Sequence, residues 1–146
     1  MVKNFWTIVN QVINESDLLV EVLDARLPNE TRHKEIEEKI KKKNKQLILV
    51  LNKTDLVSRE FAEKTKAKFQ NDFPTMYVSS TEHLGPTKLR KKIMQYIKKK
   101  PAKIGVIGYP NTGKSSIINL LKGKGSAKTS SYSGYTRGRQ LVKIAK

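Results

Sequence analysis

The chain has 146 residues, which suits one compact domain and leaves no room for two well-buried cores. Thirty Lys and Arg residues against thirteen Asp and Glu residues give a formal net charge of +17, a balance that favours polyanionic partners such as nucleic acid. The absence of cysteine excludes disulfides, thiolate metal sites and thiol catalysis.

The expected elements begin with a helix over residues 3–15, where apolar residues recur at helical spacing. Short apolar runs predict buried strands at 17–24, 46–52, 75–80 and 103–108. Apolar periodicity predicts the intervening helices around residues 36–40, 59–72 and 89–97, and one that begins near Lys114. A strand-like alternation returns only at the end of the chain, in QLVKIA (140–145).

This alternation predicts an α/β fold with a mostly parallel sheet, helices on both faces and right-handed crossovers. Ligands of such sheets bind at the carboxyl ends of the strands. The motifs described below each follow directly after an expected strand, so we expect them to converge on one crevice. Residues 124–138 are rich in Gly, Ser and Lys, have no apolar period and predict a flexible loop.

No membrane segment is expected in this chain. The longest unbroken aliphatic run, residues 47–51, is far too short to span a bilayer. The N-terminal stretch VKNFWTIVNQVINES is typical of an amphipathic helix rather than a signal peptide. We therefore expect a cytoplasmic protein without a membrane partner, and the sequence leaves the oligomeric state open.

The stretch GYPNTGKSS, residues 108–116, fits the phosphate-loop pattern G-x-x-x-x-G-K-S between a strand and a helix. Lys114 is expected to reach the β and γ phosphates of a nucleotide, and Ser115 to bind Mg²⁺. Four such positions should coincide in a chain of this length about once in a hundred cases or less, so an ordinary glycine turn is the weaker interpretation. The other loop residues expected at the nucleotide are Asn111, Thr112, Gly113 and Ser116.

The motif NKTD follows the second expected strand. The Asp55 carboxylate can accept hydrogen bonds from the N1–H and the exocyclic amine of guanine, a pair that adenine does not offer. Asn52 and Lys53 would brace the loop, with the Lys53 stem along the base. Taken alone, Asn52 and Asp55 could equally form a turn and a helix cap. The phosphate loop in the same chain favours the guanine interpretation.

Ser79 and Ser80 close the third expected strand. The backbone N–H of Ser80 could donate a hydrogen bond to the guanine oxygen. A serine pair at the end of a strand is more often a turn or the cap of the next helix, so this signal is weak by itself.

Together the three motifs resemble the guanine-nucleotide-binding set of the translation-factor class of GTPases, except that the base-reading motif precedes the phosphate loop. This order is similar to that of the circularly permuted GTPases of the YlqF/YawG type. A sheet keeps its site when its strands are connected from another starting point, provided that the former termini can be bridged. DARLP, residues 24–28, also resembles a signature of this family, although a capped loop with a surface arginine is the alternative. The resemblance covers nearly the whole chain, as a permuted GTP-binding domain over 1–146.

The resemblance implies a Mg²⁺-dependent GTPase of large ribosomal subunit assembly, with GTP or GDP as ligand and ribosomal RNA as partner. It also implies that Asn111 helps to hold a K⁺ ion against the phosphates. Within YSGYTRG (132–138) it implies a switch segment whose Thr136 hydroxyl meets Mg²⁺. Ser133 and Tyr135 stand where the family usually has Pro and Thr.

One strand of the family, ending in an Asp-x-Pro-Gly motif, has no counterpart in the sequence. We therefore expect the domain to be incomplete at its C-terminus, with the QLVKIA strand lacking its usual partner and an exposed sheet edge. We expect nucleotide binding with little or no turnover by this chain alone, because nothing in it positions the attacking water. The catalytic residues stay unassigned.

Lysines cluster at 39–45, at 88–103 and from Lys122 onward. They would dock on ribosomal RNA and release counterions, or they form ordinary solvated helix faces. Two alternatives to a GTPase stay open: a basic RNA-binding module with a vestigial nucleotide site, and an ATP-binding P-loop protein. His33 and His83 have no partners at metal-ligand spacing and are expected at the surface.

Overall fold

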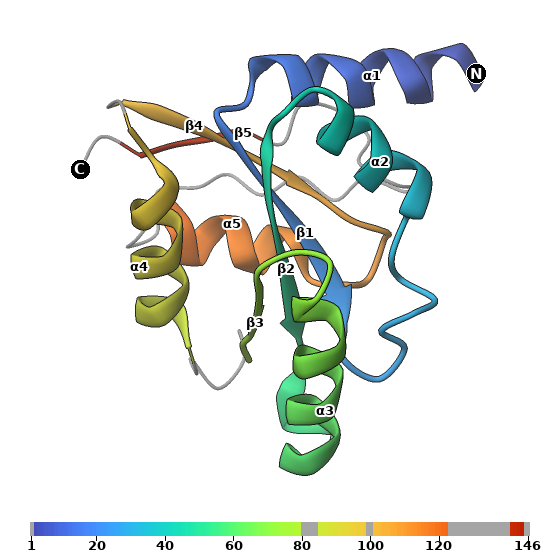
Figure 1. The fold of residues 1–146 in the computed structure, drawn as a ribbon, viewed down its shortest axis with the longest axis vertical. Coiled ribbons are helices and arrows are strands. Elements are labelled where there is room, and N and C mark those ends of the chain that lie inside the picture. Colours follow the sequence, from blue (N-terminus) through green and yellow to red (C-terminus); the bar gives the residue numbers. More distant parts are fainter. Residues whose placement is uncertain (1, 80–84, 99–100, 123–140, 145–146) are drawn as a thin grey trace.

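The computed structural model describes residues 2–79, 85–98, 101–122 and 141–144, and within them one five-stranded sheet has the order β3-β2-β1-β4-β5 (Figure 1). The strands are β1 (Leu18–Asp24), β2 (Gln46–Asn52), β3 (Thr75–Tyr77), β4 (Ala102–Ile107) and β5 (Leu141–Ile144). The first four run parallel, and β5 pairs antiparallel with β4. The predicted α/β fold with a mostly parallel sheet is confirmed.

Helices connect the strands and cover both faces of the sheet. They are α1 (Val2–Glu15), α2 (Lys34–Lys42), α3 (Arg59–Gln70), α4 (Pro86–Tyr96) and α5 (Lys114–Lys122), with a 3-10 turn, η1 (Thr54–Leu56), after β2. These bounds lie within a few residues of the predicted ones. The largest differences are at the end of β3, which is Tyr77 rather than residue 80, and at the start of α4, which is Pro86 rather than residue 89.

The two faces of the sheet form two hydrophobic cores. One core packs alternate strand residues against Leu89 and Ile93 of α4 and Ile117 of α5. The other packs the opposite strand residues against α1, α2 and α3, with Phe69 as its largest fully buried side chain. Burial on both faces explains why the strands have continuous apolar runs rather than an alternating pattern.

Polar side chains set the starts of two helices. The Ser58 hydroxyl accepts a hydrogen bond from the Phe61 N–H at 3.0 Å and caps α3. The Nδ1 atom of His33 accepts one from the Ile36 N–H at 3.3 Å and caps α2. His33 is half-buried rather than fully at the surface as expected, and its ring centroid lies 6.0 Å from that of Tyr109. His83 lies outside the described residues.

The last strand differs from expectation. We predicted that QLVKIA would lack a partner, but β5 pairs with β4, placing Val142 opposite Ile104 and Lys143 opposite Lys103. Antiparallel pairing supplies partners to the backbone N–H and C=O groups that β4 would otherwise expose along this side. In the described part of the chain, the edges of the sheet are therefore β3 and β5.

Candidate functional site

The base-reading loop and the phosphate loop meet at the carboxyl end of the sheet. Asn52, the last residue of β2, is buried, and its Nδ2 donates to the Thr112 carbonyl at 3.0 Å. The Lys53 ammonium donates to the Asn111 carbonyl. Two motifs that are 60 residues apart in the sequence are thus held together by hydrogen bonds, as their positions after parallel strands predict.

The phosphate loop turns sharply between β4 and α5. Gly113 has a φ of +99°, and a Cβ added there would lie 2.2 Å from Asn52 Nδ2, so both the backbone and the packing require glycine. Asn111 has a φ of 67°, which asparagine tolerates better than most residues. The first turn of α5 then closes with a bond from the Ile117 N–H to the Gly113 carbonyl at 3.0 Å.

Lys114 is the most unusual charge at this site. Its Nζ is buried and has no hydrogen-bond partner among the residues that the structure describes. Burial lowers the pKa of this ammonium from 10.5 to about 8. A buried cation without partners is unfavourable, so the site suits an anion that accepts its hydrogen bonds. Because Lys114 also opens α5, backbone N–H groups at that helix end can face the same anion.

Asp55 lies in η1 with an exposed side chain, directly beyond the loop contacts of Asn52 and Lys53. The buried Ser79 hydroxyl donates to Asp55 Oδ1 at 2.7 Å and orients the carboxylate. Thr54 secures the turn, since its hydroxyl donates to the Val78 carbonyl at 2.8 Å. The strand-end serine at 79 therefore supports the base-reading carboxylate directly, a contact that the sequence analysis did not foresee.

Asp24 is a second supporting residue, which the sequence placed in the DARLP signature without giving it a role. It ends β1, and its carboxylate accepts from the Arg26 backbone N–H at 2.9 Å and from the Arg26 guanidinium at 2.8 and 3.0 Å. Its Oδ2 is also 3.4 Å from Lys53 Nζ. The hydrogen bond from Arg26 is the main reason that the pKa of Asp24 is lowered to about 2. The signals for it in the sequence were the DARLP signature and its position at the carboxyl end of a strand next to β2.

The remaining predicted site residues have less defined surroundings. Ser115 is half-buried in the first turn of α5, next to an exposed Ser116. Asn111 is exposed, and its backbone carbonyl receives Lys53. Ser80, Thr136 and the predicted loop 124–138 lie outside the described residues. Among the described ones, no three His, Asp or Glu side chains are grouped as a metal centre, and no helix has the length and apolarity needed to cross a membrane.

Comparisons with known proteins agree with this arrangement. Residues 103–146 match the family model described as a 50S ribosome-binding GTPase. The chain is 50% identical over 142 residues to an uncharacterized GTP-binding protein of Methanocaldococcus jannaschii, covering 95% of this chain and 38% of that protein. It is 40% identical over 152 residues to nucleolar GTP-binding protein 2 of Yarrowia lipolytica, covering 99% and 30%.

A solved structure of GDP-bound YlqF is also similar, with a TM-score of 0.64 and 29% sequence identity over 80% of this chain and 48% of that one. The chain spans about a third of the length of these curated relatives. The similarity extends over both the base-reading and the phosphate-loop parts of the chain, in the same order as in the relatives. None of these comparisons favours an ATP-binding protein or a module with a vestigial site.

Proposed function

Because the chain is a circularly permuted GTP-binding domain, homologous to nucleolar GTP-binding proteins and to YlqF, we propose that the pocket between its two motif loops binds GTP or GDP. Asp55 reads guanine, while Lys114 and the N–H groups at the start of α5 bind the phosphates. Asn52 and Lys53 hold the two loops at the spacing that a single nucleotide needs. Ser79, Ser80, Thr112, Gly113 and Ser116 complete the pocket.

One observation carries this proposal: the hydrogen bond of 3.0 Å between Asn52 and the Thr112 carbonyl. It links the base-reading loop to the phosphate loop inside the protein, so Asp55 and Lys114 project from two joined loops. A carboxylate that selects guanine and a buried ammonium that needs an anion then face one ligand. Ser79, which fixes one oxygen of Asp55, leaves the other oxygen available to the base.

The proposal includes Mg²⁺ at Ser115 and, in the triphosphate state, at Thr136. The ion would neutralise phosphate charge, which is its general contribution to phosphoryl transfer. K⁺ held by Asn111 is a further part of the proposal, supported by the exposed position of that side chain within the phosphate loop. GTP hydrolysis belongs to the proposal for the complete protein, with little or no turnover from this chain alone.

We further propose that the domain acts in large ribosomal subunit assembly and contacts ribosomal RNA. Support comes from the family description that residues 103–146 match and from the net charge of +17. A protein with this positive charge binds RNA mainly through contacts to the phosphates and through the shape of the RNA. The cytoplasmic location expected from the sequence stays a prediction.

The guanine site is tested by the substitution Asp55→Asn. We expect GDP affinity to fall about a hundredfold, because the asparagine amide cannot accept from both guanine donors. Xanthosine diphosphate should bind the variant better than it binds the wild type, since its 2-oxo group accepts from the new amide. Calorimetric titration with GDP, ADP and xanthosine diphosphate, with Mg²⁺ present, measures all three.

The matched control is Asp72→Asn, an exposed aspartate just after α3 whose carboxylate pairs with Arg32 rather than with either motif loop. It should leave GDP affinity unchanged. Equal affinity of the wild type for GDP and ADP would contradict the guanine assignment and favour an ATP-binding protein. Repeating the titration in potassium and in sodium tests Asn111, because only a K⁺ site gives tighter binding in potassium.

A further inference from the structure

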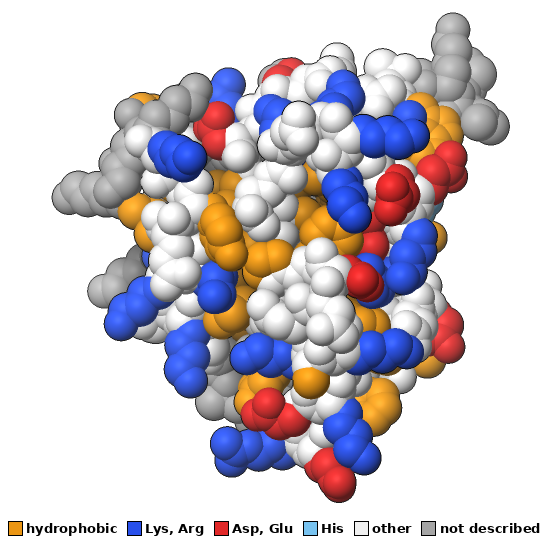
Figure 2. Space-filling model, viewed as in Figure 1, with side chains coloured by type: hydrophobic (Ala, Val, Ile, Leu, Met, Phe, Trp, Pro, Cys, Tyr) orange, Lys and Arg blue, Asp and Glu red, His pale blue; other side chains and the backbone are white. Residues whose placement is uncertain are grey.

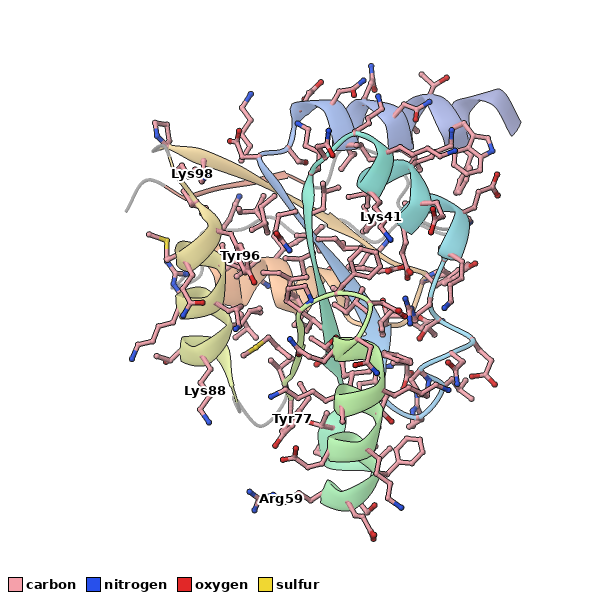
Figure 3. All side chains as sticks on the ribbon, in the orientation of Figure 1. Lys41, Arg59, Tyr77, Lys88, Tyr96 and Lys98 are labelled. Atoms are coloured by element: carbon pink, nitrogen blue, oxygen red, sulfur yellow. The ribbon has the colours of Figure 1, made fainter. Side chains whose placement is uncertain are left out.

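A cleft that adjoins the guanine site at Asp55 opens between α3 and α4 over the edge strand β3. Its volume is about 640 Å³, and its walls include Arg59 and Lys66 of α3, Tyr77 of β3 and Lys88 of α4. The phosphate loop does not contribute to its described walls. Figure 3 shows Arg59, Tyr77 and Lys88 around the opening near the lower ends of α3 and α4.

A second hollow, of about 370 Å³, shares Lys66 and Met76 with this cleft and adds Lys92 of α4. Together the two hollows form a groove along β3, which we name the α3–α4 groove. Its cations, Arg59, Lys66, Lys88 and Lys92, stand on both walls. Figure 2 shows Lys and Arg side chains on either side of the hydrophobic surface between these helices.

The α3–α4 groove has two acidic groups, Asp55 and Glu63, against its four cations. Glu63 accepts a hydrogen bond from the Tyr77 hydroxyl at 2.6 Å, and Asp55 at one end accepts from Ser79. Lys66 Nζ lies 5.5 Å from the centroid of the Tyr77 ring. The groove therefore combines a positive rim with an aromatic wall, which is the combination that single-stranded nucleic acid recognises through its phosphates and bases.

The backbone of β3 argues against an added peptide strand as the occupant. The outward N–H of Thr75 already donates to the Gln70 side chain at 3.0 Å. Gly85 packs so closely over the outward carbonyl of Tyr77 that a Cβ at Gly85 would be 3.0 Å from the oxygen. A peptide pairing with this edge would have to displace both groups, whereas RNA needs only the side chains.

We propose that the α3–α4 groove binds a single-stranded segment of RNA, with phosphates on its Arg and Lys residues and a base against Tyr77. This inference rests on the proposed function, since it names the surface by which the domain meets RNA. The groove reaches the guanine site at Asp55, so occupancy of one site can change affinity at the other.

The test compares two triple variants of the chain with equal loss of charge. One replaces Arg59, Lys66 and Lys88 by Gln, and the other replaces the α2 lysines Lys34, Lys41 and Lys42 by Gln. Fluorescence anisotropy with a labelled oligouridylate of about ten nucleotides reports affinity over a range of salt concentrations. We expect the groove variant to bind about tenfold more weakly and the slope of log K against log salt to fall by about 2, while the α2 variant changes little.

The aromatic wall is tested separately with Tyr77→Leu and Tyr77→Phe. Loss of the ring should weaken binding of the oligonucleotide about tenfold, whereas phenylalanine keeps the ring and should retain most of the affinity. Photo-crosslinking with 4-thiouridine should place the RNA on peptides that contain Tyr77 or Lys88. Equal weakening of RNA binding in both triple variants would overturn the proposal. Crosslinks on α2 alone, or crosslinks that the groove variant leaves unchanged, would overturn it as well.

GDP affinity of each variant separates this inference from the proposed function. Wild-type GDP binding in all variants together with unchanged RNA binding by the groove variant would refute the groove and leave the guanine site intact. Specific binding of an acidic peptide to the groove, abolished by the same triple variant while RNA binding persists, would also overturn the assignment to RNA.

Discussion

Lys114 illustrates how burial prepares a single residue for its ligand. Its ammonium lacks a hydrogen-bond partner among the described residues, and desolvation lowers its pKa to about 8. A phosphate would supply the missing negative charge and raise the pKa again. The residue is therefore unfavourable for the free protein and favourable for the complex, as expected of a group selected for binding rather than for stability.

The pH dependence of GDP binding should reveal this residue. Below about pH 8 Lys114 is protonated in both the free protein and the complex, so its contribution to affinity does not vary. Above that pH the free protein loses the proton and binding must restore it, so affinity should fall by up to about tenfold per pH unit. Calorimetry near pH 8.5 in two buffers with different ionisation enthalpies should show proton uptake.

Lys114→Arg is the control, because arginine stays charged across this range. The base itself ionises equally in both titrations, so the difference between the two profiles isolates Lys114. Identical profiles for lysine and arginine would contradict the assignment.

Asn52→Ala tests the hydrogen bond that joins the two loops. The Thr112 carbonyl would lose its buried donor, so the free energy of unfolding should fall by about 1 to 3 kcal/mol. GDP affinity should fall as well, since the loops are no longer held at one spacing. Urea unfolding and calorimetry measure the two effects, with the exposed Asn29→Ala as control; loss of stability without loss of affinity would show that the bond is structural only.

At the scale of elements, close packing of α1 on β4 supports the strand that leads into the phosphate loop. A Cβ added at Gly105 of β4 would lie 2.2 Å from the Ser16 hydroxyl and 2.9 Å from a methyl group of Val12. The glycine therefore lets the end of α1 lie directly against the strand. This contact brings α1, which is far from Lys114 in the sequence, onto the strand that precedes the phosphate loop.

Gly105→Ala should consequently push α1 away from β4. We expect the free energy of unfolding to fall by about 1 to 3 kcal/mol, as for other overpacked cores. Adding Ser16→Ala removes the nearest atom and should recover part of the loss, which urea unfolding of the single and double variants can measure. Strictly additive losses would show that Ser16 and the new methyl group do not meet.

At the scale of the whole molecule, the net charge of +17 acts on every conformation of the protein. Self-repulsion of this size opposes compact folding, and a polyanionic partner relieves it. The basic residues occupy several surfaces, including α2, α3 and α4, rather than a single site. Charge therefore promotes encounter with RNA in general, and shape together with aromatic contacts must supply any preference for one surface.

Salt should stabilise the free protein for the same reason. Raising sodium chloride from about 10 mM to about 200 mM shortens the Debye length and screens repulsion, so the thermal midpoint should rise by about 2 to 5 °C. Circular dichroism melting curves measure this shift. Sodium and potassium chloride should act alike without nucleotide, and a midpoint that falls with salt would show that attractive ion pairs dominate.

The sequence by itself determined the helices and strands, and the end of the sheet at which the motifs meet. Continuous apolar runs specify buried parallel strands, and parallel strands bring their carboxyl ends together, so Asn52 and the phosphate loop were predicted as neighbours. The roles of Gly113 and Lys114 were predicted from the phosphate-loop pattern, because these residues act through their own backbone and charge. Such features depend on short segments of chain, and periodicity and spacing are sufficient to predict them.

The tertiary structure alone decided the contacts between segments that local patterns do not relate. It paired β5 with β4 and placed the Asp24 carboxylate next to the Lys53 ammonium. It also brought the Ser79 hydroxyl to Asp55 and made His33 the cap of α2. It also opened the α3–α4 groove, whose walls come from three elements. Side-chain partners and cavities depend on how packed elements are positioned in space, and many arrangements are compatible with the same periodicity until the whole core is assembled.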